Sequence, residues 1–180
     1  MISKVKIILI AVMFISVVCA GCYAGITGKV IDAETQQPIE GAVVLVEWTK
    51  TKGFPGMSHT ESAKVIEVVS DKDGKVEIAG NFNPLVDPPH VTVYKKGYVA
   101  WNNEYIFPDY KKRTDFKWKS GYEFRLERYK DGYSHNDHVS FIRSSIGSSQ
   151  NLEAKGVIYN AFEWERIMAQ QERINRGLSP

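Results

Sequence analysis

The sequence has almost no cysteine: of its 180 residues only Cys19 and Cys22 are cysteines, and both lie near the N-terminus. Small secreted domains that depend on disulfides need several cysteines spread along the chain. A disulfide framework is therefore excluded for everything after Cys22. The Cys-x-x-Cys spacing of the pair has no βαβ pattern around it, which argues against a redox motif of the thioredoxin kind.

An excess of either charge is also missing. The chain has 23 basic and 21 acidic residues, and Lys4 and Lys6 make up the difference, so the sequence from Cys22 onward is neutral. A general nucleic-acid binder shows a strong basic excess, so the composition predicts no nucleic-acid partner. The sequence also lacks a phosphate-binding loop, a dinucleotide-binding glycine pattern and the His-x-x-Glu pair of a metallocarboxypeptidase.

The long apolar run of this chain lies at the N-terminus. Lys4 and Lys6 precede an apolar stretch from Ile7 to Val18, and the small residues Ala20 and Gly21 follow it. A charged start, an apolar run of about 7–15 residues and a small-residue exit are typical of a secretory signal peptide. A membrane-spanning helix needs about 20 apolar residues, so this run is short for a permanent anchor. We expect an export signal, with an uncleaved N-terminal anchor as the alternative.

The end of this segment, Cys19-Ala20-Gly21-Cys22, resembles the bacterial lipobox. In that motif small residues precede a cysteine that receives diacylglycerol before cleavage. The resemblance implies that residues 1–21 are a lipoprotein signal peptide and that Cys22, carrying acyl chains such as palmitate, becomes the first residue of the mature protein. Cys19 departs from the motif, which usually has leucine at that position. Ordinary signal-peptidase cleavage at a nearby alanine is the alternative.

Several acyl chains on one residue would hold the protein firmly, because stable membrane anchoring usually takes two lipid signals. The expected location is the cell membrane or the outer membrane, with the folded part facing the periplasm or the exterior. Tyr23 follows Cys22, whereas an Asp at that position retains enterobacterial lipoproteins at the inner membrane. The tyrosine favours the outer membrane if the source is Gram-negative.

From Gly25 to about Tyr129 the chain has the pattern of short strands separated by turns. Because Asp-Gly tolerates positive φ, Asp71 to Gly74 predicts a tight hairpin after which the next strand pairs back. The absence of helical periods between the strands predicts an antiparallel sandwich. Alternating or continuous apolar residues predict strands at Ile26–Asp32, Ala42–Trp48, Lys64–Ser70, Lys75–Ala79, around Val91–Val93 and at Tyr122–Leu126.

Three blocks in this region resemble carboxypeptidase regulatory-like domains, which belong to the transthyretin-like (prealbumin-like) β-sandwiches. The first block joins Ile26–Asp32 to Pro38–Val44, the second is Ser70–Val76 and the third is Val91–Tyr98. The blocks occur in the order found in the family. The resemblance implies a mainly β fold, a seven-stranded Greek-key β-sandwich, over residues 22–130.

The same resemblance implies structural roles and no catalytic ones. The implied turn residues are Gly41, Asp71, Asp73, Gly74 and Gly97. Carboxypeptidase regulatory-like domains serve as folding or interaction modules and carry no catalytic residues of their own. We therefore expect no enzyme activity and no cofactor, although a fold alone does not fix a function.

Residues 131–180 form the expected helical C-terminal extension. Apolar residues from Asn151 to Arg176 recur at three- and four-residue spacing, which predicts an α-helix. This helix either covers one sheet of the sandwich as a lid or presents its aromatic face to a partner. The segment from His135 to Ile142 is interpreted as a short helix, and Ser144 to Gln150 as a linker.

His135, Asp137 and His138 are weak candidate metal ligands. The two histidines are three residues apart, so they share one face if the segment is helical. Histidine and carboxylate side chains are common zinc ligands, but a third and fourth ligand are not evident in the sequence. A helix start capped by Ser134 or Asn136 is the simpler interpretation. A metal-dependent hydrolase that uses this cluster is the alternative function.

Two surface segments are the expected binding regions, because loops on a rigid scaffold often carry recognition. Thr49–Ser62 is interpreted as a long irregular loop, and Trp101–Gly121 as an aromatic-rich hairpin or covering loop. Lys111, Lys112 and Arg113 either contact an anionic surface or polysaccharide, or form a solvated hairpin face. The sequence thus predicts a non-catalytic, membrane-anchored lipoprotein that serves as a binding or structural module of the cell envelope. Its expected partner is an envelope protein or a polysaccharide.

Overall fold

The computed structural model describes residues 23–54, 56–147 and 155–178. The predicted signal peptide and Cys22 lie outside these residues. None of the helices in the described residues is both long and apolar enough to cross a bilayer. The elements in chain order are β1 (Ile26–Asp32), β2 (Val43–Lys52), β3 (His59–Val69), β4 (Lys75–Ile78), β5 (His90–Tyr94), β6 (Trp101–Asn102), β7 (Tyr105–Ile106), β8 (Lys111–Lys112), β9 (Tyr122–Leu126), α2 (His135–Ser145), α3 (Gly156–Ala161) and α4 (Glu163–Asn175).

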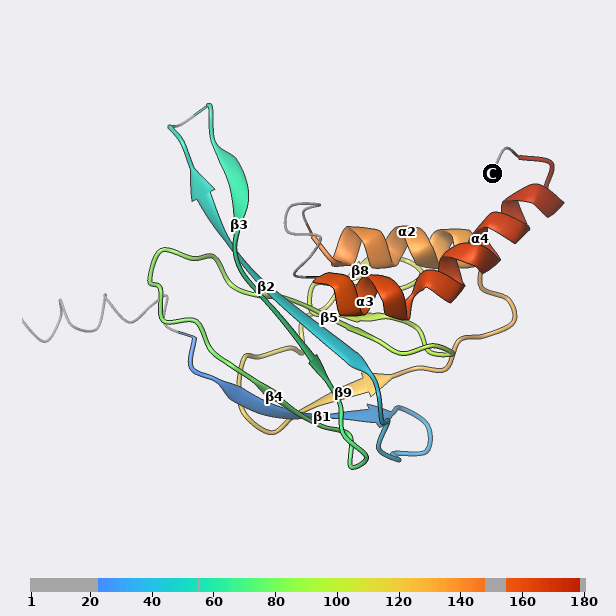
Figure 1. The fold of residues 1–180 in the computed structure, drawn as a ribbon, viewed down its shortest axis with the longest axis horizontal. Helices are drawn as coiled ribbons and strands as arrows, with labels where there is room; N and C mark the ends of the chain where they lie inside the picture. Colours follow the sequence, from blue (N-terminus) through green and yellow to red (C-terminus); the bar gives the residue numbers. More distant parts are fainter. Residues whose placement is uncertain (1–22, 55, 148–154, 179–180) are drawn as a thin grey trace, which may run out of the picture.

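Two β-sheets face each other and form a sandwich (Figure 1). One sheet has the strand order β4-β1-β9 and the other the order β3-β2-β5-β6, so the two sheets together contain seven strands. β7 and β8 form a separate short hairpin. The helices lie on the outer face of the four-stranded sheet, which makes three layers. The prediction of a mainly β sandwich with helical structure at the C-terminus is confirmed.

Strand β2 lies in the middle layer and is covered on both faces. Val44, Val46 and Trp48 enter the core between the two sheets, whereas Val43 and Leu45 pack under the helices. Successive side chains of a strand point to opposite faces, so a strand covered on both sides has few positions for polar residues. This explains the nearly continuous apolar run that the sequence has at β2.

Aromatic rings fill the core between the sheets. Trp101 meets Phe124 edge-on with ring centroids 5.1 Å apart, and Trp48 meets Trp118 in the same way at 5.5 Å. Gly28 of β1 provides the space for one of these rings, because a Cβ atom there would lie 2.8 Å from the ring of Phe124. The sequence pattern of short strands rich in aromatics therefore builds one packed interior.

A second core joins the helices to the four-stranded sheet. It contains buried residues of β2, β5, α2 and α3 and the two residues that end these helices, among them Val43, Leu45, Tyr94, Phe141, Ile142, Ile146, Ile158 and Phe162. The C-terminal helical segment therefore covers the sandwich as a lid, which was one of the two expectations from the sequence.

Strand β9 pairs with β1 in the parallel direction, which corrects the expectation of a fully antiparallel sandwich. Gly28 aligns with Tyr122, and Asp32 aligns with Leu126. A short hairpin can join only antiparallel strands, but β1 and β9 are separated in the chain by all the other strands and are therefore free to run in the same direction. The long connection from β6 through the β7–β8 hairpin supplies the return from the other sheet.

The turn at Asp71–Gly74 passes the chain from one sheet to the other and does not close the predicted hairpin. β3 pairs with β2, whereas β4 pairs with β1 in the opposite sheet. The local turn chemistry is nevertheless as expected, because Oδ1 of Asp71 accepts the N–H groups of Asp73 and Lys75 at 2.9 and 2.8 Å. Such a turn determines how the backbone reverses, and long-range packing determines which strand the next segment joins.

Three predicted turn glycines have positive φ: 71° at Gly41, 73° at Gly74 and 87° at Gly97. Gly74 also has no room for a side chain, since a Cβ atom would lie 2.4 Å from the carbonyl oxygen of Val30. L-residues rarely adopt this backbone conformation, so both conditions favour glycine. Asp73 contributes its backbone N–H to the same turn.

The segment expected as a long irregular loop is mostly paired strand. β2 continues to Lys52 and β3 begins at His59, so the unpaired part is only the tip between them. Glu61 forms ion pairs across the strands with Lys50 at 2.9 Å and Lys52 at 2.8 Å, and such cross-strand pairs support a hairpin. After Trp48 the register shifts, and the hairpin extends beyond the body of the sandwich (Figure 1).

The single helix predicted at the C-terminus is two helices. α3 ends at Ala161, α4 begins at Glu163, and Phe162 between them has φ −99° and ψ 11°. The ring of Phe162 is buried and meets Tyr94 edge-on at 6.3 Å, and the chain changes direction at this point (Figure 1). Residues 151–154, where the helix was predicted to start, lie outside the described part of the chain. The short helix predicted at 135–142 continues to Ser145 as α2.

Candidate functional site

Helix α2 begins at the residues predicted as weak metal ligands. Ser134 is the N-cap, and its side-chain oxygen accepts the N–H of Asp137 at 3.2 Å. His138 is fully buried and His135 is partly buried, whereas Asp137 is exposed. Residues three apart on a helix share a face, so the two histidines lie on the side of α2 that packs in the protein and Asp137 does not.

Glu165 of α4 is the group on which both histidines converge. Its Oε1 atom lies 2.5 Å from Nδ1 of His135 and 3.1 Å from Nδ1 of His138, and its Oε2 atom accepts the hydroxyl of Tyr94 at 3.2 Å. Nε2 of His138 accepts the backbone N–H of Ala100 at 2.9 Å. Because that nitrogen is an acceptor, the proton of the His138 ring is on Nδ1 and points at the carboxylate.

The electrostatics of this network keep Glu165 ionised. Burial by itself would raise the pKa of Glu165, but the hydrogen bonds from His138 and His135 outweigh burial and hold the pKa below its usual range. Burial, together with the negative charge of Glu165, raises the pKa of the Tyr94 hydroxyl. Tyr94 therefore stays protonated and donates its hydrogen bond.

The weak metal-site hypothesis stays a prediction, but this arrangement gives the two histidines protein partners. Both ring nitrogens of His138 already have protein partners, and the exposed Asp137 does not join the two histidines. Within residues 23–54, 56–147 and 155–178, no group of three or more His, Cys, Asp or Glu side chains is placed to hold a metal ion. The physical reason is that the carboxylate of Glu165, from a helix distant in sequence, already occupies Nδ1 of both histidines.

Sequence reasoning missed Glu165 and Tyr94, although Glu165 carried a signal. Phe162, Glu165 and Ala169 are spaced three and four residues apart, so the sequence places Glu165 on an apolar face of the helix, and the structure buries all three. A charged side chain on an apolar helix face needs a hydrogen-bonded partner in the interior. A pairing with the nearby histidines could have been suggested from this pattern.

A second carboxylate fastens the same two helices. Glu172 of α4 accepts the hydroxyl of Ser134 at 3.2 Å and the N–H of Asn136 at 3.1 Å, and it pairs with Arg176. A carboxylate at the start of a helix satisfies free N–H groups and the helix dipole. Glu165 and Glu172 together fix the N-terminal end of α2 against α4.

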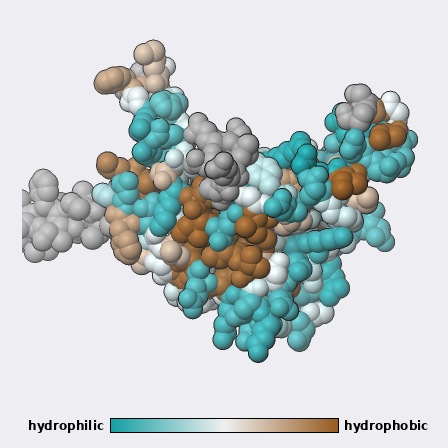
Figure 2. All heavy atoms as spheres, in the orientation of Figure 1, coloured by the Kyte–Doolittle hydropathy of each residue, from teal (hydrophilic) through white to brown (hydrophobic). Residues whose placement is uncertain are grey.

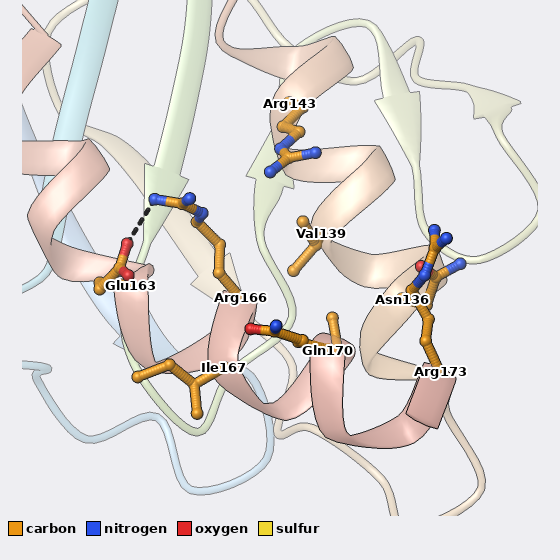
Figure 3. Close-up of a pocket in the computed structure, with 9 residues that line it drawn as sticks. Asn136, Val139, Arg143, Glu163, Arg166, Ile167, Gln170 and Arg173 are labelled. Atoms are coloured by element: carbon orange, nitrogen blue, oxygen red, sulfur yellow. Dashed lines mark hydrogen bonds and ion pairs between the residues drawn. The ribbon is translucent and has the colours of Figure 1, made fainter. Parts of the chain in front are cut away.

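A groove of about 300 Å³ lies between α2 and α4 (Figure 3). Three arginines line it, Arg143 from α2 and Arg166 and Arg173 from α4. Glu163 is the acidic residue of the lining and lies 2.5 Å from Arg166. The remaining lining residues are polar or apolar: Asn136, Val139, Ile167, Ala169 and Gln170.

The chemistry of the groove suits an anion. Val139 and Ala169 are buried and form an apolar base, while the arginine side chains lie around it as drawn in Figure 3. Three guanidinium groups face one carboxylate, so the lining has a positive charge. Arginine binds carboxylate and phosphate groups with two parallel hydrogen bonds, and a groove between fixed helices keeps the donors in place.

The basic run predicted to contact an anionic surface is divided by the fold. Lys111 and Lys112 are exposed on β8, but Arg113 turns inward and stacks over Trp101 at 4.6 Å. Arg113 also donates to the carbonyl of Asn102 at 2.7 Å and pairs with Asp115 at 3.3 Å. A polar hollow of about 510 Å³ lies beside it, and four cationic side chains in its lining accompany the carboxylates of Asp115 and Glu123.

No protein-family model matches the sequence, and no curated protein matches it significantly. Solved structures show partial similarity. A variant of the shaft pilin SpaA from Lactobacillus rhamnosus GG is 20% identical, with a TM-score of 0.36, over 61% of this chain and 48% of the pilin chain. The C-terminal domain of that pilin is 21% identical, with a TM-score of 0.34, over 59% of this chain and 98% of the domain.

Catechol 1,2-dioxygenase from Acinetobacter sp. ADP1 is 15% identical, with a TM-score of 0.40, over 62% of this chain and 54% of the dioxygenase chain. The present chain therefore spans about half the length of the pilin and of the dioxygenase that it resembles. At this level of similarity, the activities of these proteins carry no weight for the function of this chain.

Proposed function

We propose that this protein is a non-catalytic lipoprotein of the cell envelope, anchored through Cys22, that binds an anionic group of an envelope protein or polysaccharide in the groove between α2 and α4. The observation that carries the binding part is the set of Arg143, Arg166 and Arg173 around an apolar base. The scaffold is proposed to be a carboxypeptidase regulatory-like sandwich over residues 22–130, with residues 131–180 as its helical extension.

The groups that could perform chemistry support a structural role. His138, Tyr94 and Glu165 satisfy one another and a backbone N–H in the interior, and the partly buried His135 pairs with the same carboxylate. Catalytic acids and bases must reach a substrate, whereas His138, Glu165 and Tyr94 are buried. The network instead holds α2 against α4, and this sets the spacing between the helix positions that carry the arginines of the groove.

The anchoring part rests on the N-terminal sequence and on where the folded body begins. Tyr23, the residue after Cys22, already pairs with Asn81 through two backbone hydrogen bonds of 2.7 Å. A lipid on Cys22 would therefore lie directly beside the sandwich and not at the end of a long tether.

Anchoring is tested by replacing each cysteine in turn and following palmitate incorporation and precursor size in cells. Cys22→Ser should give an unprocessed, longer precursor without label, because the thiol that accepts diacylglycerol is lost. Cys19→Ser is the matched control and should be processed and labelled like the parent chain. Normal maturation and membrane retention of Cys22→Ser would contradict the lipid anchor.

Anion binding in the groove is tested with a photo-crosslinking amino acid at Gln170, in cells, with the same group at Glu77 on the opposite sheet as a control position. We expect a discrete crosslinked species from Gln170 that weakens with salt and is lost in Arg143→Gln/Arg166→Gln. A matched variant, Lys72→Gln/Lys75→Gln, removes the same charge away from the groove and should retain the species. Equal crosslinking in both double variants would contradict a role for the arginines.

A further inference from the structure

Four large apolar side chains are far more exposed than the rest. Phe54 and Met57 at the tip of the β2–β3 hairpin are 79% and 80% exposed, and Phe82 and Leu85 in the β4–β5 connection are 71% and 79% exposed. The other exposed large apolar side chains of the described residues reach at most 56%. Exposed apolar groups that gather on one side of a soluble domain mark an interaction surface.

The two segments lie next to each other. The N–H of Asp87 donates to the carbonyl of Thr49 at 2.8 Å, and the Asp87 carboxylate accepts the hydroxyl groups of Thr49 at 3.3 Å and Thr51 at 3.5 Å. Lys64 of β3 donates to the carbonyl of Gly80 at 2.6 Å. The β4–β5 connection is therefore fastened to the base of the hairpin whose tip carries Phe54 and Met57.

The chain enters the body at this same place. Tyr23 pairs with Asn81, the residue that directly precedes Phe82, and the ring N–H of Trp118 donates to the carbonyl of Ala24 at 2.9 Å. Consecutive Cα atoms are about 4 Å apart, so Cys22 is one such step from a residue bonded to this connection. Figure 1 shows the hairpin and the connection on the side from which β1 starts, and Figure 2 shows apolar side chains at the hairpin tip.

Neither segment carries charge. The tip from Gly53 to Ser58 and the connection from Ala79 to Val86 contain no Asp, Glu, Lys or Arg. A segment enters the boundary between lipid headgroups and acyl chains readily when it brings apolar side chains and buries no charge. A protein–protein interface usually has a polar rim around its apolar centre, so charged residues would be expected next to these apolar side chains if the partner were a protein.

We propose that Phe54, Met57, Phe82 and Leu85 form a bilayer-contacting rim beside the lipid anchor. This rests on the proposed anchoring of Cys22. With the acyl chains and two loop tips in one surface, the body has a fixed orientation on the membrane. Helices α2 and α4, which carry the groove, lie on the opposite side of the view in Figure 1 from the hairpin tip.

The rim is tested with single-cysteine variants of the mature acylated protein, in which Cys22 is blocked by lipid. Met57→Cys and Leu85→Cys place a thiol in the rim, and Val157→Cys on α3 is an exposed control. Each thiol is labelled with an environment-sensitive fluorophore, and the protein is reconstituted into phosphatidylethanolamine–phosphatidylglycerol vesicles with or without a nitroxide-labelled lipid. The rim labels should lose about half or more of their emission to the lipid-borne quencher, and the control label should lose little.

A second variant separates the rim from the anchor. Phe54→Ser/Phe82→Ser changes exposed side chains, so the fold should persist and the acylated protein should still sediment with vesicles, but quenching of the two rim labels should fall to the level of the control. Sedimentation without quenching of the rim labels in the parent chain would overturn the rim and leave the anchor standing. Failure of the acylated parent to sediment would overturn both. A third outcome is that the lipid-borne quencher has no effect in vesicles, while the rim labels are protected from a water-soluble quencher in native membranes. This result would identify a protein partner and overturn the lipid contact.

Discussion

The carboxylate of Glu165 lies 3.1 Å from Nδ1 of His138, and both side chains are fully buried between α4 and the sandwich. The pair joins two helices that are distant in sequence. Its ends are tied further by the N–H of Ala100 and the hydroxyl of Tyr94, both of which belong to the segment containing β5 and β6. The position of α2 relative to α4, and hence the shape of the arginine groove, depends on this contact.

Replacement of His138 by alanine should destabilise the protein by about 3–5 kcal/mol, because Glu165 and the N–H of Ala100 would lose a buried partner. Asp137→Ala is the matched control, since this neighbouring side chain is exposed, and its cost should be about 0.5 kcal/mol from the lost favourable charge at the helix start. Urea unfolding followed by circular dichroism measures both. Equal costs, or stoichiometric metal that disappears with His138→Ala, would contradict the structural role of the histidine.

The buried pair of Lys155 and Glu47 should show strong non-additivity. Nζ of Lys155 lies 2.7 Å from Oε2 of Glu47, next to the carbonyl of Ile146 at 2.9 Å, and neither charged side chain has noticeable exposure. Lys155→Met alone should lower the free energy of unfolding by about 3–5 kcal/mol, because the buried carboxylate of Glu47 loses its positive partner. The double variant Lys155→Met/Glu47→Gln should recover most of that loss. A double-mutant cycle of unfolding free energies tests this. Additive costs would show that the two side chains act independently.

Asp32 should make the protein sensitive to acid. Backbone hydrogen bonds, first from Thr35 at 2.9 Å, together with the hydroxyl of Tyr98 and the guanidinium of Arg128, lower the pKa of Asp32 from 3.8 to about 2. The unfolded chain binds this proton more readily, so the contribution is fully present above about pH 4 and is lost as the pH falls toward 2. Its size is about 2 kcal/mol.

Asp32→Asn removes the titrating group and tests this assignment. The variant should be less stable than the parent at neutral pH, and the difference in unfolding free energy between the two should shrink as the pH falls from about 4 to 2. Unfolding free energies measured across this range provide the comparison. A difference that stays constant with pH would show that Asp32 is not responsible for the acid sensitivity.

Gly74→Ala should be costly for two reasons. The residue has a φ of 73°, and a Cβ atom would meet the carbonyl oxygen of Val30 at 2.4 Å. Gly97→Ala is the control, since φ is 87° there but no atom lies within 4 Å of the added Cβ. The control should lose about 1 kcal/mol from the left-handed backbone alone, and Gly74→Ala should lose about 2–4 kcal/mol. Thermal unfolding of the two variants measures both losses of stability, and their difference is the steric cost at Gly74. Similar losses would rule out a steric contribution.

The sequence by itself determined the local features of this protein. The charged and apolar N-terminal segment, the alternation in β1 and β9, the apolar run of β2 and the turn chemistry of Asp71 and Gly74 each depend on residues within a few positions of one another. Such features follow from period, propensity and hydrogen bonds that a short segment makes with itself.

Only the tertiary structure decided which segments meet. The same turn at Asp71–Gly74 could have closed a hairpin, but the packing of β4 against β1 sends it to the other sheet. Three features join residues far apart in the chain: the parallel pairing of β9 with β1, the contact of Glu165 with two histidines, and the arginine groove. Residues this far apart leave no periodic signal, because each contact is made only after the chain has closed a long loop and buried the partners together.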